Sequence, residues 1–301
     1  MANYTLADGV TVKNKVGATR HDELERVEAD FVALRQLEVS LGFGPKGNFD
    51  ALQLKALHRH LFQDVYEGAG HTRDERIILS DGTVATEPIM KKAGGQPFLI
   101  GPAIPAALEE IAAKLREGDY LRNLPRKQFA KRAADLMAEL NAAHPFREGN
   151  GRTQRTFLRE IAKQASQNLD FSVISKERMI QASIAANEQS DVSMMRRMFD
   201  EISDPARTAL LRQSIASLEK LNFPWNDRYV ATLTPGHPVE LVFAGAAGDQ
   251  FMARSQTEIL FGNAAHLPEL RPERGEIFHV TATRYPRLGK RPRGDASRRE
   301  E

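Results

Sequence analysis

The feature that most constrains the fold is a helical spacing of apolar residues that runs from about residue 21 to about residue 221. Apolar side chains recur there every three or four positions, which is typical of amphipathic helices packed around a shared core. Asp50 is predicted to cap one helix, and Asp204-Pro205 supplies a cap and a first-turn proline to another. The predicted apolar stripes are Leu24, Val27, Phe31 and Leu34; Leu54, Leu57, Leu61, Phe62 and Val65; Ile104, Leu108, Ile111 and Leu115; Phe129, Ala133, Leu136, Met137 and Leu140; and Phe157, Leu158 and Ile161.

Two segments with a different sequence pattern are found, one within the helical part and one after it. Between residues 76 and 102, the pairs Asp81-Gly82 and Gly94-Gly95 are turn signals between short apolar runs, which predicts one or two inserted β-hairpins. Beyond residue 228, the runs YVATL, VELVF, EILF and EIFHVTAT predict a small β domain, for which a barrel is one available architecture. The predicted domains are a helical domain at 1–222, a β domain at 228–286 and a disordered charged tail at 287–301.

Composition excludes several classes of protein. The chain carries 42 basic and 40 acidic side chains, so it lacks the strong cationic field of a dedicated nucleic-acid binder. It has no cysteine, which rules out disulfides, thiolate metal sites and a thiol nucleophile. No apolar run approaches the roughly 20 residues that span a bilayer, and the N-terminus shows no secretion signal. We therefore expect a protein made in a cytosol, with export by a route that needs no such signal left open.

The segment His144-Pro-Phe-Arg-Glu-Gly-Asn-Gly-Arg-Thr-Gln-Arg155 combines features that suit a polyphosphate. Gly149 and Gly151 flank Asn150 just ahead of a predicted helix, where consecutive backbone N–H groups can turn inward to bind an anion. Arg152 and Arg155 are three residues apart and so share one helix face, from which both can reach phosphate oxygens. The segment is therefore predicted to be a phosphate-binding loop between two helices.

Two further side chains of this segment fit chemistry at a phosphate. Glu148 offers the hard oxygen ligand that Mg²⁺ prefers beside phosphates and waters. His144 is the one side chain of the segment whose ordinary pKa lies near neutrality, which suits a general base. A glycine turn before a helix, or a basic helix face, is usually structural when it stands alone. Found together within one short segment, these groups indicate phosphoryl transfer.

These residues carry a resemblance to a known family. HPFREGNGRTQR is similar, at every defined position, to the HPFx(D/E)GNGRxxR signature of Fic proteins, and LFQDVYEGAGHTR, from Leu61 to Arg73, resembles the family's second conserved block. The resemblance extends over roughly residues 4 to 200. It implies a mainly α Fic helical bundle with an inserted β-hairpin flap. The β domain weakly resembles the OB-like barrel, of the oligonucleotide-binding type, that follows the Fic domain in some bacterial secreted effectors.

The resemblance also implies an activity, the transfer of AMP from ATP to a Tyr, Thr or Ser hydroxyl of a target protein with release of pyrophosphate. By analogy, His144 deprotonates the hydroxyl and Glu148 holds the Mg²⁺ that bridges the α- and β-phosphates. The loop of Gly149, Asn150 and Gly151 wraps the phosphates. Arg152 then binds the β-phosphate and Arg155 the γ-phosphate.

The hairpin from Lys92 to Ile100 resembles the family's flap, on which a target segment adds as an extra strand. Lys92, Phe98, Leu99 and Ile100 are the residues predicted to dock the target. For any single one of them, an ordinary surface hairpin is the alternative interpretation.

The sequence also bears on regulation. Many Fic proteins carry an inhibitory helix of the pattern (S/T)xxxE(G/N), which this sequence lacks. The resemblance to the toxin and antitoxin branch therefore implies that any inhibitor is a separate small protein, and that the chain acts in the bacterial cytoplasm or as an exported effector. Two alternatives stay open: a Fic-fold enzyme that transfers another phosphate-containing group, and a non-catalytic binding module.

Overall fold

The computed structural model describes residues 4–91 and 97–285. The chain divides into two compact units. A helical unit comprises Met1–Leu169 and Ser183–Val192, and a C-terminal unit comprises Asp170–Ala182 and Ser193–Glu301. Helix α6, Lys176–Glu188, contributes residues to both. The mainly α fold with a C-terminal sheet is confirmed, whereas the domain bounds at 222 and 228 stay a prediction, and the tail at 287–301 lies outside the described residues.

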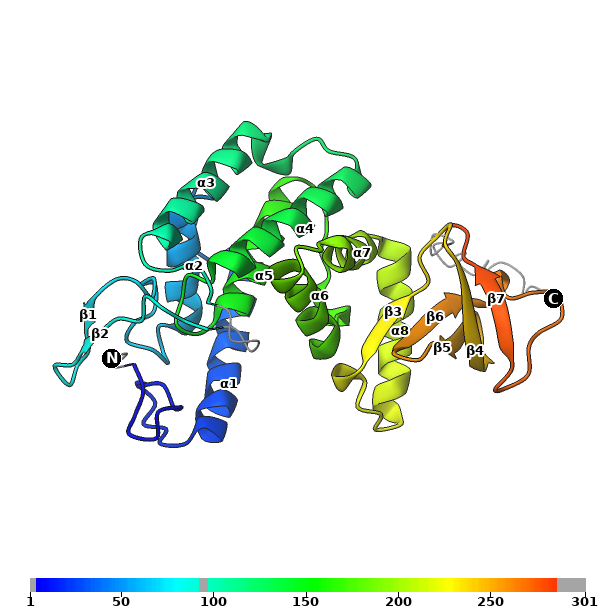
Figure 1. Cartoon of the computed structure of the whole chain (residues 1–301), viewed down its shortest axis with the longest axis horizontal. Coiled ribbons are helices and arrows are strands. Elements are labelled where there is room, and N and C mark those ends of the chain that lie inside the picture. Colours follow the sequence, from blue (N-terminus) through cyan, green and yellow to red (C-terminus); the bar gives the residue numbers. More distant parts are fainter. Residues whose placement is uncertain (1–3, 92–96, 286–301) are drawn as a thin grey trace, which may run out of the picture. The chain divides into compact units, whose positions relative to one another are not determined.

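The helical unit is built around helix α5, which lies against both α2 and α4 (Figure 1). Helix α2 begins where Asp50 accepts a hydrogen bond from the N–H of Gln53 at 2.9 Å, so the predicted cap is confirmed. The helices of this unit, apart from its share of α6, are α1 (His21–Ser40), α2 (Ala51–Phe62), α3 (Ala103–Glu117), α4 (Arg126–Ala143) and α5 (Asn150–Gln164).

The core confirms the predicted apolar stripes of α2, α3, α4 and α5, whose members are all buried. The predicted stripe of α1 is wrong in part, because Phe31 and Leu34 are 37% and 52% exposed. Helix α1 is turned so that it buries Glu28 and Val32 instead. The physical reason is that the carboxylate of Glu28 meets two polar partners inside the unit, which the apolar pattern alone could not reveal.

One predicted hairpin is present, and the second is described only at its ends. Strands β1 (Ile77–Ile78) and β2 (Val84–Ala85) pair antiparallel, and Gly82 takes a positive φ of 79° in the turn. In the second hairpin, Lys91 pairs with Pro97, and the N–H of Phe98 donates to the carbonyl of Met90 at 2.9 Å. Lys92 and the Gly94-Gly95 turn lie outside the described residues.

The C-terminal unit contains α7 (Ser193–Ile202), α8 (Pro205–Lys220) and a five-stranded sheet. Asp204 accepts a hydrogen bond from the N–H of Ala206 at 3.0 Å, and Pro205 begins α8, as predicted. The sheet has the order β3-β6-β5-β4-β7, in which β3 and β6 are parallel and the other neighbours antiparallel. Its strands are β3 (Tyr229–Thr232), β4 (Pro238–Ala247), β5 (Gln250–Arg254), β6 (Glu258–Asn263) and β7 (Ile277–Thr281).

The sheet confirms the four predicted β runs and adds strand β5, which has no β-branched residue to mark it. Its core includes the rings of Phe243, Phe251 and Phe278, whose centroids lie 5.9 to 6.4 Å apart. Within the described residues no ladder joins the edge strands β3 and β7, so the sheet is not a closed barrel. The expectation of an OB-like barrel is therefore not met.

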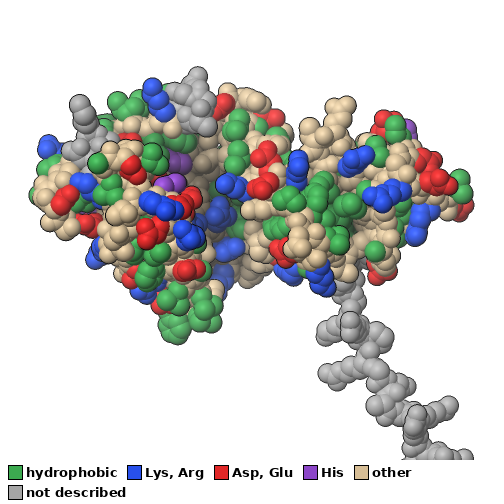
Figure 2. All heavy atoms as spheres, turned by 90° about the horizontal axis from the view of Figure 1, so that it is seen from below, with side chains coloured by type: hydrophobic (Ala, Val, Ile, Leu, Met, Phe, Trp, Pro, Cys, Tyr) green, Lys and Arg blue, Asp and Glu red, His purple; other side chains and the backbone are tan. Residues whose placement is uncertain are grey.

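Two surface properties bear on function. Figure 2 shows acidic and basic side chains intermixed on the face in view, in keeping with the near balance of charge. In the described part of the chain, no helix has the length and apolar character needed to cross a membrane.

Candidate active site

The segment predicted to carry chemistry forms the loop between α4 and α5. Helix α4 ends at Ala143, and His144 caps it in the left-handed conformation, with φ 43° and ψ 58°. The N–H of His144 still donates to the carbonyl of Leu140 at 3.0 Å. Helix α5 begins at Asn150. His144 therefore stands at the start of a tight loop that ends at a helix N-terminus.

Asn150 shapes this loop with its own side chain. Its Nδ2 donates to the carbonyl of Phe146 at 2.7 Å, and its Oδ1 accepts from the N–H of Phe146 at 2.9 Å. Phe146 is 1% exposed and stacks on the ring of His58, with the centroids 3.8 Å apart. Phe146 thereby anchors the loop in the core. Because the amide of Asn150 is occupied in this way, its part in the site is to set the loop's shape.

His58 supports the loop from α2. The N–H of Gly70 donates to Nδ1 of His58 at 2.8 Å, so this nitrogen is the acceptor and Nε2 carries the proton. Nε2 lies 3.0 Å from the carbonyl of Glu148, to which it donates. Burial lowers the pKa of His58 to about 3, so the ring remains neutral at physiological pH. His58 thus supports the loop through two hydrogen bonds to backbone groups.

Gly149 is required both by conformation and by space. Its φ is +76°, and a Cβ at this position would lie 2.2 Å from Cζ of Phe62. Phe62 therefore packs directly against the backbone of Gly149 at the start of α5.

Arg152 is held in place by Glu28 and Phe62. Its Nη2 donates to Oε1 of Glu28, and its guanidinium lies over the ring of Phe62, 5.1 Å from the centroid. Glu28 is 5% exposed, and its other oxygen accepts a hydrogen bond from the hydroxyl of Tyr66 at 2.9 Å. Burial raises the pKa of Glu28, an effect that the charge of Arg152 opposes. Among the contacts of the described residues, Nη2 alone of the Arg152 N–H groups is engaged, so the others can donate to a ligand.

Arg155 lies beside Arg152 without such a partner. Among the residues that the structure describes, no carboxylate forms an ion pair with it, and its guanidinium is 3.3 Å from the position of a Cβ on Gly151. Burial and the charges of Arg159 and Arg152 lower the pKa of Arg155 to about 10. A partly buried guanidinium repelled by two others favours the arrival of an anion.

The contact of Tyr66 with Glu28 gives a stability prediction. Tyr66→Phe should destabilise the chain by about 1.5–3 kcal/mol, because it removes a donor from a buried carboxylate. Urea unfolding of wild type and variant measures the difference. The matched control is Tyr4→Phe, since Tyr4 is also 6% exposed but packs with Ile77, Leu79 and Ala85. An equal decrease in the free energy of unfolding for the two variants would show that the hydrogen bond to Glu28 does not stabilise the fold.

Glu148 offers one accessible carboxylate at the edge of the loop. Its side chain is 40% exposed, and Oε1 accepts from Nη1 of Arg147 at 2.8 Å. Arg147 is in turn paired with Glu87 at 2.5 Å. In the described part of the chain, no group of three or more His, Cys, Asp or Glu side chains is placed to hold a metal ion. This donor set fits Mg²⁺, which typically takes one carboxylate and completes its shell with phosphates and waters.

The predicted flap lies against His144. The ring of Phe98 stacks on the imidazole, with centroids 3.9 Å apart and planes 12° apart. The N–H of Leu99 donates to the carbonyl of Ala142 at 3.4 Å, and Ile100 is 45% exposed. The structure therefore brings Phe98 and Leu99 to the loop that bears His144, while Lys92 is outside the described residues.

Four functional neighbours were not predicted from the sequence. Glu28 gave no signal, since it lies in a helix rich in acidic residues. His58 gave no signal either, because its partners are backbone groups of Gly70 and Glu148. Tyr66 and Arg73 belong to the block LFQDVYEGAGHTR, whose presence was noted without assigning them roles.

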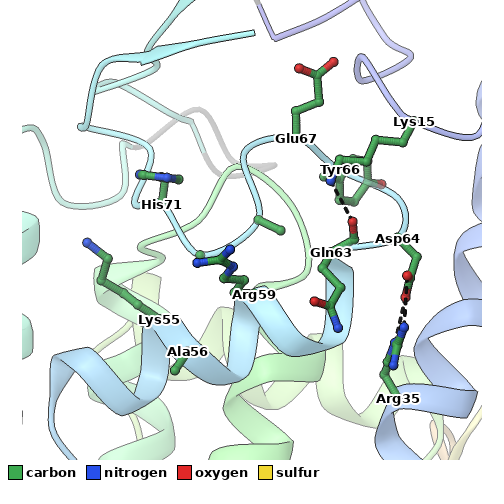
Figure 3. A pocket seen from close by; sticks show the side chains of 12 residues that line it. Lys15, Arg35, Lys55, Ala56, Arg59, Gln63, Asp64, Tyr66, Glu67 and His71 are labelled. Carbon is green, nitrogen blue, oxygen red and sulfur yellow. Dashed lines mark hydrogen bonds and ion pairs between the residues drawn. The ribbon is translucent and has the colours of Figure 1, made fainter. Parts of the chain in front are cut away.

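The cavities of the helical unit include two that differ in whether they adjoin the loop. One of about 160 Å³ is lined by residues that include Glu28, Tyr66, Glu148 and Arg152, so it adjoins the loop. A larger one of about 630 Å³ follows α2 and the segment after it, and no residue of the 144–155 segment lines it (Figure 3). Arg35 and Lys55 in this larger cavity are already paired with Asp64 and Glu75.

Comparison with known proteins agrees with the residues of this site. A model of the Fic/DOC family matches residues 48–162. Over 278 residues the sequence is 35% identical to a protein adenylyltransferase of Bartonella henselae, an alignment that covers 92% of this chain and 50% of the relative. The chain thus spans half of that relative's length.

Solved structures extend the similarity to most of the chain. The type IV secretion system effector protein BepA is 32% identical with a TM-score of 0.84, over 94% of this chain and 97% of that one. The BepC protein of Bartonella tribocorum, solved with bound AMPPNP, is 36% identical with a TM-score of 0.65, over 67% and 97%. The similarity to BepA reaches beyond the helical unit into the C-terminal sheet.

Proposed function

The chain belongs to the Fic/DOC family, and from this premise we propose that it is a protein adenylyltransferase, which transfers AMP from ATP to a Tyr, Thr or Ser hydroxyl of a target protein. The observation that carries the proposal is the folding of residues 144–155. One tight loop presents an imidazole, a carboxylate, a glycine turn and two arginines around the N-terminus of α5. Each of these groups has a task in nucleotidyl transfer.

The triphosphate is assigned to the start of α5. The backbone N–H groups of residues 149–151 and the positive end of the helix suit phosphate oxygens. Arg152 takes the β-phosphate with the donors that Glu28 leaves unused. Arg155 takes the γ-phosphate, whose charge would relieve the repulsion that lowers its pKa. Binding of AMPPNP by BepC supports a nucleotide as the ligand.

His144 is assigned the proton transfer. Its imidazole accepts the proton of the target hydroxyl, the hydroxyl oxygen forms a bond to the α-phosphorus, and the bond from that phosphorus to the bridging oxygen of the β-phosphate breaks. Pyrophosphate leaves with the electron pair, and the charges of Arg152 and Arg155 stabilise it. The flap, packed on His144 through Phe98, is assigned the docking of the target segment.

Glu148 would hold a Mg²⁺ ion at this site. Bound there, the ion would neutralise charge on the phosphates and orient them. The partial exposure of the Glu148 carboxylate and its position at the edge of the loop suit this role.

The transferred group decides between this proposal and another chemistry on the same fold. Purified chain is incubated with a cell lysate and ATP labelled at either the α- or the γ-phosphate. AMP transfer places only the α-label on protein, because pyrophosphate carries the γ-label away. Protein labelled by γ-phosphate alone would point to phosphate transfer, and no protein label from either ATP would favour a non-catalytic binding module.

We further propose that inhibition, where it occurs, comes from a separate small protein. Arg155 would offer an inhibitory carboxylate the same partner as the γ-phosphate, because burial and two neighbouring guanidiniums disfavour its charge when no anion is bound. A chain made in the bacterial cytoplasm and exported to another cell is consistent with the effector name of BepA.

A further inference from the structure

Arg73 is a fully buried arginine, at 0% exposure, and ends the block LFQDVYEGAGHTR. In the described structure its guanidinium donates to backbone carbonyls. Nε donates to His144 at 2.8 Å, Nη1 to Pro88 at 2.8 Å and to Glu87 at 3.2 Å, and Nη2 to Leu99. Burial lowers the pKa of Arg73, although Asp74 and Glu87 oppose this effect.

Burying a guanidinium costs free energy unless hydrogen bonds replace its contacts with water. Arginine is rarely buried completely without a paired carboxylate, since its charge loses the solvation of water. Here the charge-assisted hydrogen bonds to four carbonyls offset that loss. The planar fork of arginine can reach carbonyls on several sides at once, which the single ammonium of lysine cannot do.

The four carbonyls belong to segments that meet at the active site. Glu87 and Pro88 lie where the chain enters the flap, Leu99 lies where it leaves, and His144 is the proposed base. The backbone of Arg73 adds to this connection, because its N–H donates to the carbonyl of Pro145 at 2.7 Å and its carbonyl accepts from Glu87 at 2.7 Å. One residue thus joins both arms of the flap to the loop of the base.

We infer that Arg73 is a positioning residue, which fixes the flap relative to His144 and so aligns a docked target hydroxyl with the imidazole. This inference rests on the proposed function for its chemical meaning. The guanidinium bonds to no residue of the phosphate-binding turn at 148–155, so Arg73 acts on the acceptor side of the reaction. The stacking of Phe98 on His144 is the contact that this arrangement holds in register.

The test compares Arg73→Lys with Arg76→Lys, since Arg76 is exposed in the same segment. With α-labelled ATP and a cell lysate as acceptor, Arg73→Lys should lose protein labelling by about ten- to a hundredfold, because small misplacements of reacting groups carry such costs. Its affinity for AMPPNP should stay within about twofold of wild type. Arg76→Lys should match wild type in both. Wild-type labelling by Arg73→Lys, or a parallel loss of AMPPNP affinity, would overturn the inference.

Hydrogen exchange gives a readout that does not need activity. In Arg73→Lys, the amides of residues 98–101 should exchange faster, while those of α2 and α5 stay protected. If the wild-type chain labels no protein, the proposed function fails. The exchange result still tests whether Arg73 positions the flap. Unchanged exchange at 98–101 would contradict the inference that Arg73 positions the flap.

A second variant covers the case in which Arg73→Lys does not fold. Phe98→Ala keeps the contacts of Arg73 but removes the ring that packs on His144. Loss of labelling with retained AMPPNP affinity supports the alignment of flap and base. Labelling at the wild-type rate would refute it.

Discussion

Replacing His144 by alanine is expected to slow AMP transfer by about 10²–10⁴-fold, which is the usual contribution of a general base. The structure gives the reason for assigning this role to His144. It stands at the left-handed end of α4, at the start of the loop that leads to the glycine turn, and it packs against Phe98 of the flap. The rate is measured with purified enzyme and α-labelled ATP at saturating nucleotide.

The same substitution should leave AMPPNP affinity close to that of wild type. The groups assigned to the phosphates are Arg152, Arg155 and the turn at 149–151, and the His144 side chain is not among them. His237→Ala is the matched control, because this exposed histidine lies in the C-terminal unit. Transfer at the wild-type rate in His144→Ala would mean that another group takes the proton.

Replacing Glu201 by glutamine is expected to destabilise the C-terminal unit by about 3–5 kcal/mol. Glu201 is 0% exposed and pairs with Arg178 and Arg207, whose side chains are each 2% exposed. It also accepts hydrogen bonds from the N–H and the hydroxyl of Thr232, at 2.5 Å each. The variant would leave two buried guanidiniums without the carboxylate that lies between them.

Trp225 reports this loss directly, since it is the single tryptophan and lies in the C-terminal unit. Urea unfolding followed by its fluorescence gives the free energy of unfolding of that unit. Glu269→Gln, at an exposed glutamate of the same unit, should change it by less than about 0.5 kcal/mol. Similar small changes for both variants would show that the buried network contributes little.

The pH dependence of the Glu201 effect follows from its pKa. Burial alone would raise this pKa, but the charges of Arg178 and Arg207 hold it below the ordinary value of 4.5. A lowered pKa in the folded state stabilises the fold above the ordinary pKa, and that contribution is lost as pH falls through the folded value. The difference in the free energy of unfolding between wild type and Glu201→Gln should therefore become smaller as the pH falls below about 4.

Local patterns predicted most of the helices and the loop of the site because those depend on residues close in sequence. The caps at Asp50 and Asp204 and the loop from His144 to Gly149 were confirmed. Residues whose roles depend on distant partners were missed. Glu28 faces Arg152 across 124 positions, and that contact turns α1 away from its expected face. Arg73 donates to backbone carbonyls, which every residue carries, so its partners could not be identified from the sequence.

The sheet shows a similar limit. Its longer β-rich runs were predicted, whereas β5 was missed because Gln250–Arg254 lacks β-branched residues. The sequence left a barrel open as one architecture, and the described strands form an open sheet, because closure requires pairing between β3 and β7 that depends on register and tilt across the whole sheet.

Transfer of AMP to protein by the loop from His144 to Arg155 can be tested in cells. Mass spectrometry compares the proteins of cells that express the wild-type chain with those of cells that express His144→Ala. We expect a gain of one AMP on a Tyr, Thr or Ser of at least one protein in the wild-type sample and none in the variant. The same AMP-modified residues at the same level in both samples would contradict it.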